Sequence, residues 1–276
     1  MNALSRTTVN FAHELRSGRH FGVFIDDTGS PGLETPGLHA KRKSWVAVLV
    51  PPTQTAEVME QLPNALSFLK TVGINDPEFH FTDILAGKGE YSKLDLQARL
   101  GIFRFMAHIF ATYRFPVLVQ TFDPDNAADI QNRADWPTTF GPLKIANHED
   151  LGLIFLLLRV RAHLQSPACG NATACVVVDE GRLPNGHSFV LSGLAPTFVA
   201  GGVLFASSRQ VHAIQLADFA AFALNRWQLL LAKSKLTELD KTLLTIFAPV
   251  AEHYINIDVV RIHGFPNLTN LRQGLN

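Results

Sequence analysis

The first candidates for chemistry are aspartates that stand where apolar segments of the chain end. Asp26 and Asp27 follow the apolar run 21–25, and Asp179 follows the run 174–178. An ionised carboxylate beside a hydrophobic core is unfavourable unless it is hydrogen-bonded, paired or coordinated. We therefore expect Asp179 and one or both of the first two aspartates to hold a partner. For Asp179 taken alone, a turn-forming role is the plain alternative.

A third candidate lies in segment 213–224, which is apolar on nearly every side and predicts a buried helix. Gln215 and Asp218 share one face of this helix because they are three residues apart. A buried Asp218 needs either an arginine from elsewhere or a bound cation. Since few Lys or Arg lie nearby in the sequence, one cation shared with Asp26 and Asp179 is the simplest answer. Mg²⁺ or Mn²⁺ suits this set because hard divalent ions prefer carboxylate oxygen.

The short segment 78–82 alternates polar and apolar residues. Alternation predicts a strand with Glu78 and His80 on one face and Phe79 and Phe81 on the other. Several acids converging on one point are what two-metal phosphodiester hydrolysis requires, and Glu78 is a fourth candidate ligand. His80 suits proton transfer because imidazole titrates near neutral pH. The alternative for both residues is the solvated face of an edge strand.

A basic cluster between the first two apolar runs supplies candidates for binding a phosphate. Lys41 and Arg42 are its central members, although a charged hairpin connection is often only a solvated turn. The chain has 24 Lys plus Arg and 24 Asp plus Glu, a formal net charge of zero. It therefore has no global attraction for a polyanion, and any nucleic-acid substrate must be held locally.

The elements that must position these residues follow from hydrophobic periodicity. Apolar runs predict strands at 21–25, 45–50, 115–122, 174–178, 202–205 and 255–262. Helical spacing predicts helices at 55–72, 96–113, 149–164, 211–232 and 236–247. The first two strands form a hairpin, the segment near 124–147 is an irregular insertion, and a helical extension begins at about 233. The fold class is thus α/β, a mixed sheet flanked by helices, with 21–25 as a central strand.

Composition excludes several classes of protein. The 276 residues are 47% hydrophobic and 17% charged, which excludes disorder and favours a single domain over 1–276. Cys169 and Cys175 fit neither a disulfide framework nor a zinc-ligand pattern, so we expect a reducing compartment and Cys175 in the core. The apolar stretches fall far short of a membrane span, so we expect a cytoplasmic protein. The sequence leaves the oligomeric state open.

Four motifs occur in order over most of the chain, from about residue 21 to residue 226: a strand ending in Asp26 and Asp27, the tripeptide 78–80, a strand ending in Asp179, and Ser208 followed by the tetrapeptide 215–218. Together they resemble the domain of unknown function 3800 family, bacterial and phage proteins predicted to have an RNase H-like fold. The last motif is the most specific. Asp27 and Thr28 stand where the family usually has Glu and Ser. The resemblance says more about fold than about substrate.

The resemblance implies an RNase H-like mixed sheet and assigns roles to residues of this chain. The acidic site would consist of Asp26, Glu78, Asp179 and Asp218, with His80, Ser208 and Gln215 around it, the last two as substrate contacts. Combined with the residue chemistry, it favours a divalent-metal-dependent phosphodiesterase, most simply a nuclease. The alternative is a non-catalytic metal- or partner-binding regulatory module on the same fold.

A rival enzyme class is suggested by Asp27, Thr28 and Gly29, which spell the aspartic-protease signature. Such proteases need two facing aspartates, and the sequence has no second copy of the motif. The several long helices predicted above also conflict with an all-β fold. We therefore do not favour this class.

Overall fold

The structure is a computed structural model that describes residues 6–29, 39–75, 78–131 and 137–255. It is an α/β protein built on a mixed sheet with strand order β7-β8-β6-β1-β2-β3-β9. The strands are β1 (Phe21–Asp27), β2 (Lys43–Val50), β3 (Val117–Phe122), β6 (Ala174–Asp179), β7 (Ser188–Phe189), β8 (Phe198–Ala206) and β9 (Tyr254–Ile255). A separate small hairpin joins β4 (Thr139–Phe140) to β5 (Leu143–Lys144).

Strand β1 lies at the centre of this sheet, as the apolar run 21–25 predicts. It pairs antiparallel with β2 and parallel with β6. Strand β3 pairs antiparallel with β2, and β8 pairs parallel with β6. The side chains of Val23, Phe24 and Ile25 are fully buried, because helices cover the sheet on both faces.

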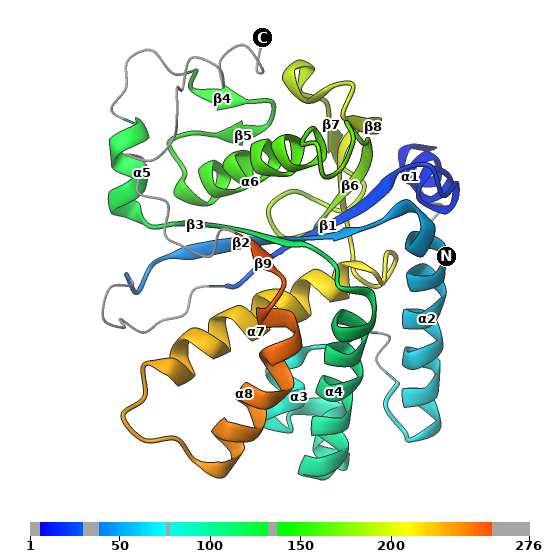
Figure 1. Cartoon of the computed structure of the whole chain (residues 1–276), viewed down its shortest axis with the longest axis vertical. Helices are drawn as coiled ribbons and strands as arrows, with labels where there is room; N and C mark the ends of the chain where they lie inside the picture. The colour runs from blue at the N-terminus through cyan, green and yellow to red at the C-terminus, as the bar shows by residue number, and fades with distance from the viewer. Residues whose placement is uncertain (1–5, 30–38, 76–77, 132–136, 256–276) are drawn as a thin grey trace.

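The helices form two layers (Figure 1). The larger layer comprises α1 (Arg6–Arg16), α2 (Pro52–Thr71), α3 (Phe81–Ala86), α4 (Leu96–Tyr113), α7 (Ile214–Leu231) and α8 (Glu238–Ala251). The other layer comprises α5 (Pro124–Gln131) and α6 (His148–Leu164) with the β4–β5 hairpin. Two 3₁₀ turns, Gly89–Lys93 and Ser192–Leu194, complete the described elements.

Alternation along β1 assigns its side chains to the two layers. Phe24 belongs to the core beneath α7, whereas Val23 and Ile25 belong to the core beneath α6. On β6, Val177 lies on the α7 side in the same way, and Val178 lies on the α6 side. Asp26, which follows Ile25, and Asp179, which follows Val178, therefore lie on the α7 side of the sheet.

Two of the predicted elements are wrong. Segment 78–82 is not a strand: residues 78–80 are irregular, and Phe81 begins helix α3, where it packs on Phe103 and Phe219. A five-residue alternation is too short to outweigh that burial. The insertion near 124–147 contains helix α5 and the β4–β5 hairpin, because Ala127 and Ile130 bury themselves in the α6-side core.

Further differences concern the ends of the chain. Helix α1 was not predicted, although Phe11 and Leu15 give it a buried face. Of the strand expected at 255–262, only Ile255 lies within the described residues, in β9. Across the described ranges, none of the helices has the length and apolar character needed to span a bilayer.

Candidate functional site

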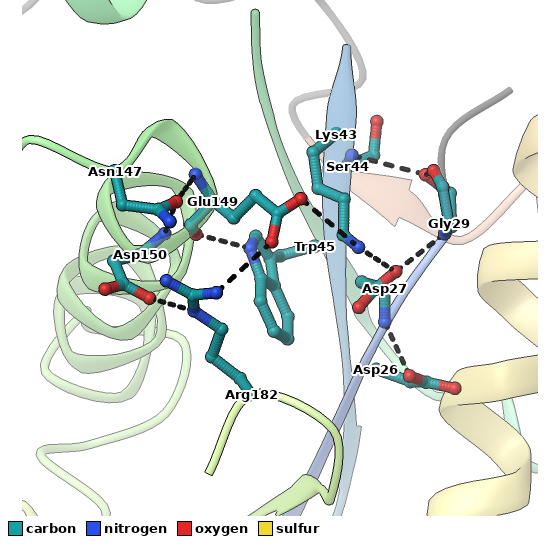
Figure 2. A network of polar contacts seen from close by, with 11 residues as sticks. Asp26, Asp27, Gly29, Lys43, Ser44, Trp45, Asn147, Glu149, Asp150 and Arg182 are labelled. Carbon is teal, nitrogen blue, oxygen red and sulfur yellow. Dashed lines mark hydrogen bonds and ion pairs between the residues drawn. The ribbon is translucent and has the colours of Figure 1, made fainter. Parts of the chain in front are cut away.

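The end of β1 directs two consecutive carboxylates to opposite faces of the sheet. Asp27 points to the α6 side, where its Oδ1 lies 2.7 Å from Lys43 Nζ and accepts the N–H of Gly29 at 2.6 Å. Asp26 follows Phe24 on the α7 side, and its Oδ1 accepts the N–H of Asp27 at 2.7 Å (Figure 2). The alternation of a strand thus separates two acids that are neighbours in the chain.

Asp27 belongs to a chain of ion pairs that reaches α6. Lys43 Nζ also lies 4.0 Å from Glu149, which is 3.6 Å from Arg182, and Arg182 in turn donates to Asp150 (Figure 2). The charge of Asp27 is therefore balanced within the fold. This pairing gives Asp27 a structural role and removes the basis for the aspartic-protease alternative.

Asp26, Asp179 and Asp218 gather on the other face, from β1, β6 and α7. Burial raises the pKa of Asp26, and the charges of Asp218 and Asp179 raise it further. Burial, and next the charge of Glu78, raises the pKa of Asp179 to about 7. Burial, and next the charge of Asp179, raises the pKa of Asp218 to about 7. The three acids are thus partly buried and repel one another.

One oxygen of Asp179 bears on whether a cation fits here. The backbone N–H groups of Glu180 and Ser208 act in the opposite direction and lower the pKa of this carboxylate. Its Oδ1 is nevertheless buried with no hydrogen-bond partner among the residues that the structure describes. A buried orphan carboxylate oxygen is costly, and a hard divalent cation would give it a partner.

The donor chemistry fits Mg²⁺ or Mn²⁺, and Asp26, Asp179 and Asp218 are the residues that would hold it. Within the described ranges, no three His, Cys, Asp or Glu side chains are already spaced as the ligands of one ion. The structure therefore brings the predicted acids to one face and couples them electrostatically without presenting a formed metal centre.

Glu78 is bound by three donors, and its negative charge acts on Asp179 and Asp218. The hydroxyl of Ser208 donates to its Oε1, while His80 Nε2 and Arg209 Nε lie 3.3 Å and 2.9 Å from its Oε2. His80 above all, with Ser208 and Arg209, lowers the pKa of Glu78 to about 2 against the opposing effect of burial. The sequence predicts Glu78 as an ion ligand or as a nearby acid, and both roles stay predictions.

Helix α7 fixes the segment that carries Glu78 and His80. Gln215, fully buried, accepts the backbone N–H of Phe79 on its Oε1 at 3.2 Å. Tyr91 Oη donates to the carbonyl of Glu78 at 2.8 Å. The same helix therefore supplies Asp218 and immobilises the irregular segment beside it. Gln215, predicted to contact substrate, is turned inward in this structure.

The predicted basic cluster divides between the surface and the interior. Lys41 is exposed. Arg42 is only 2% exposed and donates to the carbonyl of His39 and to Gln228 Oε1 of α7 at 3.1 Å and 3.3 Å. Its guanidinium joins the start of β2 to α7 and is not presented at the surface, and a phosphate contact by Arg42 stays a prediction.

Cys175 lies in the core of β6, as predicted, and burial raises the pKa of its thiol to about 12. Sequence reasoning missed Arg209, and it missed the pairing of Lys43 with Asp27. Lys43 is the member of the basic cluster that opens β2, and Arg209 directly follows the predicted Ser208. Comparison with protein-family models, with curated proteins and with solved structures found no match.

Proposed function

We propose that the protein is a Mg²⁺- or Mn²⁺-dependent phosphodiesterase, a nuclease of RNase H-like type. The observation that carries the proposal is the convergence of Asp26, Asp179 and Asp218 on one face of the sheet, with mutual repulsion and an unpartnered oxygen on Asp179. Acids so placed destabilise the fold unless a cation or bound protons offset their charge.

The RNase H-like assignment is part of the same proposal. It is supported by a central β1 that pairs antiparallel with β2 and parallel with β6. Acids at the ends of β1 and β6, with a further acid from the late helix α7, agree with the site that the family resemblance implies. The resemblance itself rests on the sequence motifs.

Each described side chain has a role in the proposed reaction. Asp26, Asp179 and Asp218 hold the ions, which when bound supply an activated water and positive charge beside the phosphate. His80, whose side chain is 43% exposed, is reachable by substrate and transfers a proton. Glu78 orients the imidazole of His80, as carboxylates commonly do for histidines at catalytic sites. Gln215 holds the backbone between them.

The decisive experiment is a panel of RNA, DNA and small phosphodiesters assayed with Mn²⁺, with Asp26→Asn as the inactive control. Cleavage by the wild-type protein that Asp26→Asn abolishes supports the proposal. The alternative is a non-catalytic metal- or partner-binding regulatory module on the same fold. The regulatory-module alternative is supported if Mn²⁺ raises the melting temperature and none of the substrates is cleaved.

A further inference from the structure

Arg209 lies in the turn between β8 and α7, at the edge of the acidic site. Its side chain is 56% exposed, and its Nε donates to Glu78 Oε2 at 2.9 Å. This contact fixes the position of Arg209 Nε relative to His80, because Nε2 of His80 contacts the same carboxylate oxygen. Arg209 is therefore an oriented and solvent-accessible cation.

The preceding residue connects Arg209 to the acids. The hydroxyl of Ser208 donates to Glu78, and its backbone N–H lies near enough to Asp179 to lower the pKa of that carboxylate. Because consecutive Cα atoms are about 3.8 Å apart, the Arg209 backbone lies one residue from a group that acts on a proposed ion ligand. Its exposed side chain thus lies on the solvent side of the site, next to where a phosphate would sit.

The charge balance explains why such a cation matters. Metal ions offset the charge of the phosphate that is cleaved, but they do not offset that of its neighbours along a strand. The chain has no net charge, so a flanking phosphate needs a local cation. Two other cations are far less exposed than Arg209: Lys43, on the opposite face, is 13% exposed, and Arg42 is buried.

We propose that Arg209 binds a phosphate that flanks the cleaved one, so that the substrate is a polynucleotide strand rather than a small phosphodiester. The inference rests on the proposed function and adds to it a substrate class and a binding residue. The guanidinium suits this role because its planar fork matches a phosphate and an orientation fixed in advance loses little freedom on binding.

The test compares Arg209→Gln with a matched control, Arg19→Gln. Arg19 is likewise exposed, at 64%, and is likewise paired with a glutamate, Glu14 at 3.2 Å. It precedes the first residue of β1, however, whereas Asp26 lies at the other end of that strand. Affinity for a fluorescent single-stranded oligonucleotide is measured by anisotropy with Ca²⁺ over a series of KCl concentrations. Values of kcat/KM with Mn²⁺ are measured for the oligonucleotide and for bis(p-nitrophenyl) phosphate.

We expect Arg209→Gln to weaken oligonucleotide binding about tenfold at low salt. The slope of log K against log salt should fall by about 0.7 to 0.9, the loss of one phosphate contact. The ratio of oligonucleotide to small-diester kcat/KM should fall about tenfold, the same loss of one charged contact. Arg209→Lys, which keeps the charge, should retain the salt slope, and Arg19→Gln should match wild type.

An unchanged salt slope in Arg209→Gln overturns the inference, as does an equal loss of kcat/KM on both substrates, which would mean that Arg209 acts only through Glu78. Failure of the proposed function looks different: the wild-type protein then cleaves neither substrate. In that case the salt slopes of wild type and Arg209→Gln still decide whether Arg209 contacts a polynucleotide.

Discussion

Asp26 and Asp27 are adjacent in the chain, yet their carboxylates serve opposite faces of the sheet. Asp27 is paired with Lys43 at 2.7 Å on the α6 side. Asp26 lies toward α7, where Asp218 and Asp179 raise its pKa through their negative charge and burial raises it more. One acid therefore stabilises the fold through an ion pair, whereas the other destabilises it until a cation or a proton is bound.

Replacing each of these acids by asparagine should give opposite results. Asp26→Asn should abolish Mn²⁺-dependent cleavage and the Mn²⁺-induced rise in melting temperature, with equal or higher stability in EDTA, because one repelling charge is lost. Asp27→Asn should keep the Mn²⁺ effect and lose about 1 to 3 kcal/mol of unfolding free energy, because Lys43, 13% exposed, loses the closer of its two acidic partners. Calorimetry with and without Mn²⁺ checks both; identical behaviour of the two variants would contradict the assignment.

Stability in EDTA should depend on pH in a direction set by the raised pKa values. Asp179 and Asp218 hold their protons up to about pH 7 in the native state and release them at lower pH when unfolded. Between these limits the native state binds more protons, so the free energy of unfolding falls as pH rises from about 4 to about 7. Asp218→Asn should flatten this fall, and Asp125→Asn, an exposed control, should not.

Metal binding should show the complementary dependence on pH. Because a carboxylate must release its proton to bind an ion, the Mn²⁺-induced rise in melting temperature should be larger at about pH 8 than at about pH 5. A rise of equal size at both pH values would show that the ion binds elsewhere than at Asp179 and Asp218.

The seating of α6 on β2 depends on a glycine. A Cβ on Gly152 would lie 2.8 Å from Cδ1 of Trp45, whose indole N–H donates to the carbonyl of Glu149 at 2.7 Å. Gly152→Ala should therefore cost about 1 to 3 kcal/mol, even though alanine favours a helix. Gly101→Ala in α4, where nothing lies within 4 Å, should instead stabilise by up to about 1 kcal/mol. Urea denaturation of both variants tests the pair; equal effects would rule out the contact.

The sequence predicts the strands around the acids because their apolar runs are long and buried on both faces. It also identifies Asp26, Asp179 and Asp218 as acids that need partners. It fails at 78–82, where five alternating residues imitate a strand although Phe81 belongs to a helix. The pairs Asp27–Lys43 and Glu78–Arg209 join distant segments, so neither charge pattern nor periodicity reveals them.

The variant Glu78→Gln tests whether Glu78 binds an ion or orients a catalytic group. In Glu78→Gln the remaining carbonyl oxygen can still accept from Ser208, but an amide cannot balance both His80 and Arg209. Turnover should therefore fall by about 10² or more, the contribution typical of a positioned proton-transfer group. The Mn²⁺-induced rise in melting temperature should persist, in contrast to Asp26→Asn.

Because the pKa of Glu78 is lowered to about 2, its stabilisation is present above about pH 4.5 and is lost as pH falls through 2. The variant should accordingly be less stable than wild type at neutral pH, with the difference disappearing in strong acid. Loss of the Mn²⁺ effect in Glu78→Gln would instead make Glu78 an ion ligand.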